Sequence, residues 1–438
     1  MKKLSVLGTL ILLLALTGCY DANEPNDYAY VVAIGIDKAE KEKEYEISVQ
    51  FAKPAQISGG SSEEGGSGGE TLGLVTVEAP TIHSGINIAN NILSKRFQLS
   101  HTKMIVVSEE LAKEGINDII YTVIRSTDLR PNMYVAVAKK SAKEYLAAVE
   151  PEMEINPVKY YQLIFENQAT ELVPKSFSEH IYFYINSNER DIVLPLVAKS
   201  KEPKKESSSG DGKSDGEGQE NGSNESQEEN TKLPKTDAKT NYDGFEYLLE
   251  EYIAGEISAN KKNKSEAMGA AVFSGDKMVG ELNALETEIY NILNGSFIYN
   301  YNTFYSEEYP KEPMVMMVRQ YKPPTISVKI KEGKPEISVK VNMEGSVVSV
   351  AGNYLLEEDI YKNEDRIEGY IEAELEKFLY KTSKELGTDI LGFGTRAKKE
   401  FSDYGEFENF NWREAYKRAE FKVDSDFSIR RTGLIIKK

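Results

Sequence analysis

The first 19 residues constrain this chain most, because they have the pattern of an export signal and contain the only cysteine of the chain. Lys2 and Lys3 precede an apolar run from Leu4 to Leu16, and small residues then lead to Cys19. The run is shorter than the ~20 apolar residues that a transmembrane helix requires. A charged start, a short apolar centre and a small-residue end are typical of a cleaved signal peptide. With no second cysteine, the exported body has to fold without a disulfide.

The end of this signal, Leu16-Thr17-Gly18-Cys19, resembles a lipobox. In a lipobox the thiol takes a diacylglyceryl group and becomes the first residue of the mature chain, so we predict removal of residues 1–18 and lipidation of Cys19, palmitate being one expected acyl group. Two acyl chains matter because a single chain binds a bilayer only marginally, on the order of 10⁴ M⁻¹. The alternatives are an ordinary signal peptide or an uncleaved anchor with a chance cysteine.

Length and charge set the next limits. A chain of 438 residues has room for several domains, and its net charge of −18 disfavours nucleic acid and anionic lipid headgroups as partners of the body. No later stretch approaches the length and apolarity of a transmembrane helix. The body is therefore expected to be soluble, with the lipid as its only evident anchor.

A change of composition divides the chain. Residues 199–241 are rich in Ser, Gly, Glu, Lys, Asp and Asn and carry too little apolar surface to fold. We expect a disordered acidic linker or a long excursion from a domain edge, between an N-terminal unit at 19–198 and a C-terminal unit at 242–438. A shorter run, Ser58–Gly69, predicts a disordered loop between strands, because no Gly-Lys-Ser/Thr follows that would make it a phosphate-binding loop.

The first half alternates β-branched or aromatic runs with amphipathic segments, which predict strands and helices respectively. The expected strands are Tyr28–Ile36, Tyr45–Phe51, Leu72–Val77, Met104–Val107 and Met133–Ala138. The expected helices are Thr81–Phe97 with Thr81 as N-cap, one from Ser108 to about Arg125, and a capped helix at Ser141–Val149.

The second half predicts a hairpin, a helix, a run of strands and the longest helix. The expected elements are the hairpin Ala270–Leu282 closing on Ser274-Gly275-Asp276, a helix from about Asn283 to Leu293, strands Phe297–Phe304, Val315–Tyr321, Ile326–Ile330 and Ile337–Val350, a long helix stopped by Gly387, a short helix including Trp412, and a strand Phe421–Ile429. Pro323-Pro324 and Gly333 are expected to separate strands. The fold class is therefore predicted as α+β, with several mixed α/β modules that are each a twisted sheet packed with helices.

Several separate stretches resemble one family, the Ger(x)C spore germination lipoproteins. The stretches that carry the resemblance are Gly35-Ile36-Asp37, His101–Val107, Leu111–Gly115, Arg125 with Asp128-Leu129-Arg130, Gly269–Phe273, Gly275–Lys277, Gly280–Asn283, Glu286-Thr287, Asp389–Gly394 and Ile429–Gly433. The long acidic stretch and the Gly/Ser insert depart from the family pattern.

The resemblance implies a C subunit of a nutrient germinant receptor in endospore-forming bacteria. It implies two membrane-embedded partners, an A subunit and a transporter-like B subunit, and a lipid-anchored position on the outer face of the spore inner membrane. Members have no assigned catalytic site, so the resemblance implies a receptor or scaffold subunit and not an enzyme.

The residues themselves also favour a protein without catalytic or metal chemistry. His83, His101 and His180 are the only histidines and share no short spacing, while the only thiol is assigned to the lipid. Neither a zinc site nor a Cys–His pair is therefore expected, and His101 is better interpreted as structural. We predict no catalytic residue, no metal and no cofactor beyond the diacylglyceryl group on Cys19.

Arg125, Asp128 and Arg130 form the one other cluster of interest, because Asp128 can pair with either arginine. Two interpretations stay open: a salt-bridged brace at a helix end, or a surface that docks a partner.

Two other functions also stay open. A solute-binding lipoprotein of a membrane transporter would close two lobes on a small molecule, and a cell-wall hydrolase would need two convergent carboxylates. The sequence does not identify the nutrient, the receptor stoichiometry, whether this chain contacts the nutrient, or how its two halves are oriented.

Overall fold

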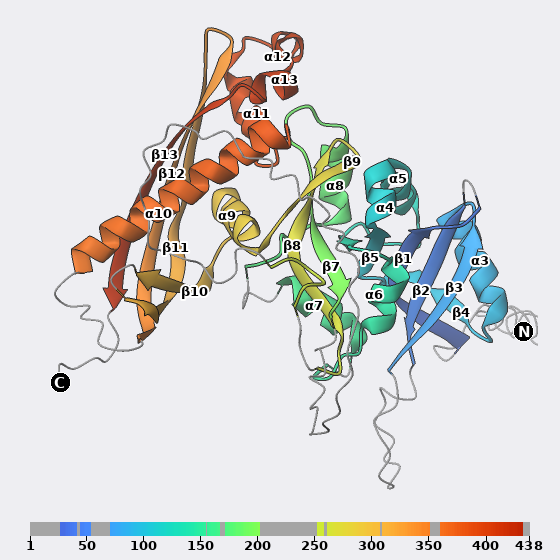
Figure 1. The fold of residues 1–438 in the computed structure, drawn as a ribbon. Helices are drawn as coiled ribbons and strands as arrows, with labels where there is room; N and C mark the ends of the chain where they lie inside the picture. The colour runs from blue at the N-terminus through green and yellow to red at the C-terminus, as the bar shows by residue number, and fades with distance from the viewer. Residues whose placement is uncertain are drawn as a thin grey trace, which may run out of the picture.

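The computed structural model describes residues 27–41, 44–53, 71–154, 156–166, 171–201, 252–257, 261–306, 309–350 and 360–431. In this part the chain forms two β-sheets packed with helices (Figure 1), which confirms the predicted α+β class. Cys19, the Ser58–Gly69 loop and nearly all of the expected linker lie outside the described residues.

The first sheet has nine strands and follows the order β3-β2-β1-β5-β6-β7-β8-β9, with β4 paired to β1. Its strands are β1 (Tyr28–Lys38), β2 (Tyr45–Ala52), β3 (Leu72–Ala79), β4 (Arg96–Gln98), β5 (Met104–Ser108), β6 (Tyr134–Ala138), β7 (Val193–Lys199), β8 (Ser265–Ser274) and β9 (Lys277–Leu282). The central strands β1, β5, β6 and β7 are parallel, and the outer pairs are antiparallel. Every residue of β5 and β6 is buried, as expected of parallel strands covered on both faces.

Helices cover both faces of this sheet. On one face, α3 (Ile82–Ile92), α4 (Glu109–Glu114), α5 (Asn117–Arg125) and α8 (Ser178–Ile185) bury aliphatic residues in a core shared with Ile34, Ile105 and Leu194. On the other face, α6 (Ala142–Ala148) and α7 (Pro157–Glu166) pack on the alternate strand residues, such as Met104 and Val106. The alternation of neighbouring strand residues between the two cores follows from the two-residue period of a strand.

The second sheet has the order β10-β11-β12-β13 and is covered by the longest helix. Its elements are β10 (Tyr299–Ser306), β11 (Tyr309–Lys331), β12 (Lys334–Val350), β13 (Glu420–Arg431) and α10 (Ile360–Tyr380), and Figure 1 shows α10 lying along the sheet. The short elements after α10 are η3 (Lys381–Glu385), α11 (Phe393–Ala397), η4 (Lys398–Glu400), α12 (Tyr404–Phe410) and α13 (Trp412–Tyr416). One further short element, η2 (Leu99–His101), lies in the first half of the chain.

Helix α9 (Ala284–Asn294) lies between the two sheets, and residues 284–285 and 287–293 are buried. Its core contains Val193 and Val272 from the first sheet together with Val339 and Phe378 from the second part. Because one hydrophobic core runs from the edge of the first sheet through α9 to the second sheet, the two sheets are packed together and not merely tethered.

Several predicted elements differ at their ends. The helix that starts at the Thr81 N-cap stops at Ile92, because residues 96–98 turn into β4 and pair with β1. The helix expected from Ser108 to Arg125 is two helices, since Gly115 takes a φ of 135° that a helix cannot contain. The pair Pro323-Pro324 does not end a strand: β11 continues through it, and the pairing with β12 shifts register between Lys322 and Thr325.

The sheets do not divide at 199–241, where the sequence places a boundary. Strands β8 and β9, assigned from the sequence to the C-terminal unit, extend the first sheet, and Lys199 of β7 pairs with Ser265 of β8. Strand pairing over such a separation leaves no local signal in the sequence.

Candidate functional site

The Arg125 cluster lies on the surface, in and just after the last turn of α5. Arg125 donates to the Tyr121 hydroxyl at 3.2 Å and stacks over its ring at 5.2 Å. Arg125, Asp128 and Arg130 are exposed, and within the described residues no ion pair joins Asp128 to either arginine. The pairing of Asp128 with Arg125 or Arg130 that the sequence suggested is therefore not seen among the described residues.

Aromatic side chains of α5 and the adjoining helix α8 lie on the same surface as Arg125. Tyr121 of α5 is 44% exposed, Phe183 of α8 is 70% exposed, and the Tyr121 and Tyr182 ring centroids are 6.2 Å apart. Tyrosine, phenylalanine and arginine gathered on adjoining helices form the kind of surface that carries binding energy at protein interfaces. We call Tyr121, Arg125, Tyr182 and Phe183 the α5–α8 patch.

The histidines are dispersed in the structure. His83 lies 3.2 Å from the Ser126 hydroxyl, and the His101 ring packs edge-on against Tyr30 at 5.3 Å. Among the described residues, no group of three or more His, Cys, Asp or Glu side chains is placed to hold a metal ion. No helix in the described part of the chain combines the length and apolarity needed to cross a bilayer.

The most elaborate polar cluster joins the first sheet to the C-terminal helices and centres on Asp389. Its carboxylate is 2% exposed and accepts hydrogen bonds from the backbone N–H groups of Phe393 (3.0 Å) and Gly394 (2.7 Å) and from Trp412 Nε1 (2.9 Å). Burial raises the pKa of Asp389 to about 6, although these three donors act in the opposite direction.

Asp191 brings the first sheet into the same cluster. This residue lies just before β7, and its backbone N–H donates to the Asp389 carbonyl at 2.8 Å. Its carboxylate accepts from Arg413 at 2.8 Å and from the Gly275 N–H, in the β8–β9 turn, at 3.0 Å. Burial raises the pKa of Asp191, and the Gly275 N–H and Arg413 partly offset that rise. We call these residues the Asp191–Asp389 joint. Both oxygens of each carboxylate accept hydrogen bonds, which is typical of a structural connection.

The close packing of this joint requires a glycine at position 394. A Cβ at this position would lie 2.6 Å from the Glu189 carbonyl oxygen and 2.7 Å from the Trp412 ring. We expect Gly394→Ala to lower the free energy of unfolding by about 2 to 3 kcal/mol, the range of overpacked cores. Gly405→Ala, at an exposed site in α12 where a Cβ would lie 3.2 Å from the Asp403 carboxylate, is the control and should change the free energy of unfolding by less than about 1 kcal/mol. Urea denaturation measures both, and equal effects would contradict the predicted close packing.

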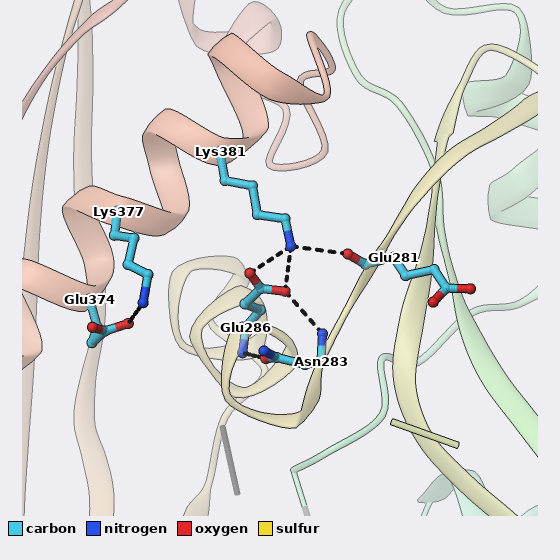
Figure 2. Close-up of polar contacts among 6 residues, drawn as sticks. All are labelled: Glu281, Asn283, Glu286, Glu374, Lys377 and Lys381. Carbon is cyan, nitrogen blue, oxygen red and sulfur yellow. Dashed lines mark hydrogen bonds and ion pairs between the residues drawn. The ribbon is translucent and has the colours of Figure 1, made fainter. Parts of the chain in front are cut away.

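A second connection lies between β9, the start of α9 and the end of α10 (Figure 2). Lys381 Nζ contacts both carboxylate oxygens of Glu286, at 2.6 and 2.7 Å, and donates to the Glu281 carbonyl at 3.2 Å. The same Glu286 completes a capping box with Asn283, the N-cap of α9. One lysine after α10 therefore binds both β9, the last strand of the first sheet, and α9, the helix between the two sheets.

Two protein-family descriptions match this chain. A spore germination protein N-terminal domain matches residues 21–199, and a spore germination B3/GerAC-like C-terminal domain matches residues 268–433. The chain belongs to the Ger(x)C family of spore germination proteins. The resemblance drawn from scattered sequence stretches is thereby confirmed.

Relatives of known name extend over the whole chain. Spore germination protein KC of Bacillus subtilis (strain 168) is 24% identical, covering 99% of this chain and 97% of the relative. Spore germination protein B3 of the same strain is 20% identical over 99% of this chain and 98% of its own length. A crystal structure of the GerBC protein is similar with a TM-score of 0.49 and 16% identity, covering 91% of this chain and 96% of that one.

Several residues in the stretches that carry the Ger(x)C resemblance have structural roles. Gly35 lets α6 approach β1, since a Cβ there would lie 2.9 Å from the Leu146 side chain. Asp37 accepts from the Ala142 and Lys143 N–H groups at 2.7 and 2.9 Å and so caps α6. Asp389 and Gly394 build the Asp191–Asp389 joint. Asp191 and Arg413 belong to none of these stretches, and their pairing across more than two hundred residues has no signal in a single sequence.

Proposed function

We propose that this Ger(x)C protein is the non-enzymatic C subunit of a spore nutrient germinant receptor. It is anchored on the outer face of the spore inner membrane by a diacylglyceryl group on Cys19, and it assembles with membrane-embedded A and B subunits to trigger germination. The match to both family domains over most of the chain carries this proposal.

The geometry supports a binding subunit over the solute-binding alternative. A solute-binding protein closes two lobes through a hinge, whereas here α9 shares one core with both sheets and two polar connections join them. The described carboxylates at the joint are engaged by donors, which also gives no support to a hydrolase that needs a free acid pair.

Copurification tests the assembly directly. Tagged protein solubilised from the inner membrane of dormant spores should bring down both an A and a B subunit, identified by mass spectrometry. Tight binding of an amino acid or sugar by the isolated protein, with closure in solution scattering, would instead favour a solute-binding lipoprotein. Hydrolysis of cortex peptidoglycan by the isolated protein would overturn both.

The α5–α8 patch is our candidate docking surface. Arg125→Ala should change the free energy of unfolding by less than about 1 kcal/mol, because an exposed arginine over an aromatic ring contributes little. It should reduce recovery of the A and B subunits and the germination response at least about tenfold, as expected of a hot-spot residue. Arg418→Ala, also exposed and outside the patch, is the control. Loss of stability with assembly intact would identify Arg125 as a brace.

A further inference from the structure

A pocket of about 420 Å³ opens where the adjacent parallel strands β6 and β7 end. The first turn of α6 and residues 254–256 form the rest of its wall. Its volume falls in the range of small-molecule sites. In open α/β sheets, ligands bind outside the carboxyl ends of parallel strands, which is where this pocket lies.

The pocket concentrates positive charge on an acidic protein. The lysines that line it are Lys139, Lys140, Lys199 and Lys201. Lys139 pairs with Glu281 at 2.5 Å, while the other three form no ion pair within the described part of the chain. In a chain with a net charge of −18, three ammonium groups on one pocket that pair with no described carboxylate indicate a binding site for an anion.

Two buried hydroxyl groups point to the same conclusion independently of charge. Tyr145 is fully buried and Ser200 is 6% exposed; both line the pocket, and neither hydroxyl oxygen has a hydrogen-bond partner among the described residues. Burying a hydroxyl without a partner is unfavourable, so such groups generally meet a ligand or water. Burial also raises the pKa of Tyr145 well above its ordinary value, so this hydroxyl stays protonated even at alkaline pH.

We propose that this pocket binds a phosphate group, carried either by a small soluble molecule or by a phospholipid headgroup. Lys140, Lys199 and Lys201 supply the charge. Tyr145 and Ser200 donate hydrogen bonds to the phosphate oxygens. The site lies within this one chain, so it is independent of the proposed receptor assembly.

Two carboxylates in the wall of the pocket restrict the class of ligand further. Glu144 and Glu256 line the pocket, and their negative charge weakens the binding of a bare phosphate without preventing it. Both are acceptors, so they suit a ligand whose phosphate is linked to a portion with hydroxyl or amino groups. The glycerol of phosphatidylglycerol and the hydroxyls of a sugar phosphate both meet this requirement.

The first test is calorimetric titration of the whole protein, purified with Cys19→Ser so that no acyl chain contributes, with inorganic phosphate and glucose 6-phosphate. We expect saturable binding that is at least about tenfold weaker in the double variant Lys199→Ala/Lys201→Ala. The control is Lys329→Ala, which removes an exposed lysine on β11 that pairs with no described carboxylate, and this variant should bind as the parent protein does.

The Tyr145→Phe variant tests whether the Tyr145 hydroxyl binds a ligand or only belongs to the packed core. It removes only the unpartnered hydroxyl, so the thermal midpoint should hold or rise, while phosphate affinity should fall several-fold. Affinity unchanged in both Tyr145→Phe and the double lysine variant would overturn the proposal, even if phosphate binds elsewhere on the protein.

Vesicle flotation distinguishes the two sources of phosphate. Binding to phosphatidylglycerol vesicles, but not to phosphatidylcholine vesicles, and its loss in Lys199→Ala/Lys201→Ala would assign a lipid headgroup. Binding of glucose 6-phosphate without vesicle binding would assign a soluble ligand. Absence of binding to every probe would overturn the site, and copurification of the A and B subunits would still test the receptor role separately.

Discussion

Asp389→Ala is expected to lower the free energy of unfolding by at least about 4 kcal/mol. The substitution leaves the N–H groups of Phe393, Gly394 and Trp412 buried without an acceptor, and each such group costs about 1 to 3 kcal/mol. Asp403→Ala is the control: this carboxylate caps exposed helix α12 and should cost only about 1 kcal/mol. Urea denaturation at neutral pH measures both, and comparable losses would contradict a special role for Asp389.

The same carboxyl gives a pH signature with a definite sign. Its pKa is about 6 in the folded protein against an ordinary value of 3.8, so between these values the folded state keeps a proton that the unfolded state has lost. Its contribution to stability is therefore fully present below pH ~4 and lost as pH rises through about 6, by roughly 3 kcal/mol. In Asp389→Asn this part of the pH dependence should vanish. An identical slope in the wild type and the variant would contradict the raised pKa.

Cys19→Ala is expected to release the protein from the membrane almost completely when the A and B genes are also deleted. Each buried methylene of an acyl chain contributes about 0.8 kcal/mol, so two chains dominate membrane affinity. Fractionation of sporulating cells and the mass of the N-terminal peptide measure the effect. Ser5→Ala, which changes the signal but not the lipidated residue, should behave as wild type. Membrane association of Cys19→Ala at the wild-type level would show that the lipoprotein prediction is wrong.

Local signals in the sequence were sufficient for much of the fold. Thr81, Ser141 and Asn283 each cap the helix predicted after them, because a cap depends on residues three positions away. No element is expected from the sequence between residues 150 and 198, where the structure has α7, α8 and β7. Pro195 argues against a central strand, yet β7 contains it, and its pairing with β8 is irregular there.

The candidate sites could be predicted less well from the sequence, because their residues come together only in the tertiary fold. Asp389 and Gly394 were named only through the Ger(x)C resemblance, and their partners Asp191 and Arg413 come close only through the tertiary fold. The phosphate pocket likewise joins the ends of two strands with α6, and its unpartnered hydroxyls are recognisable only once burial is known. For the Arg125 cluster the sequence left two alternatives, a docking surface and a brace, and both stay predictions.

The pairing of β7 with β8 has a consequence for how this chain tolerates change. The sheet itself holds the two strands together through Lys199 and Ser265, so the chain between these two residues leaves and re-enters the sheet at paired positions. Closing a loop between paired positions becomes only about 0.6 kcal/mol less favourable with each doubling of loop length. Relatives with this strand order are therefore free to gain or lose dozens of residues here, and an epitope or fluorescent reporter inserted in this stretch would leave both the joint and the α5–α8 patch in place.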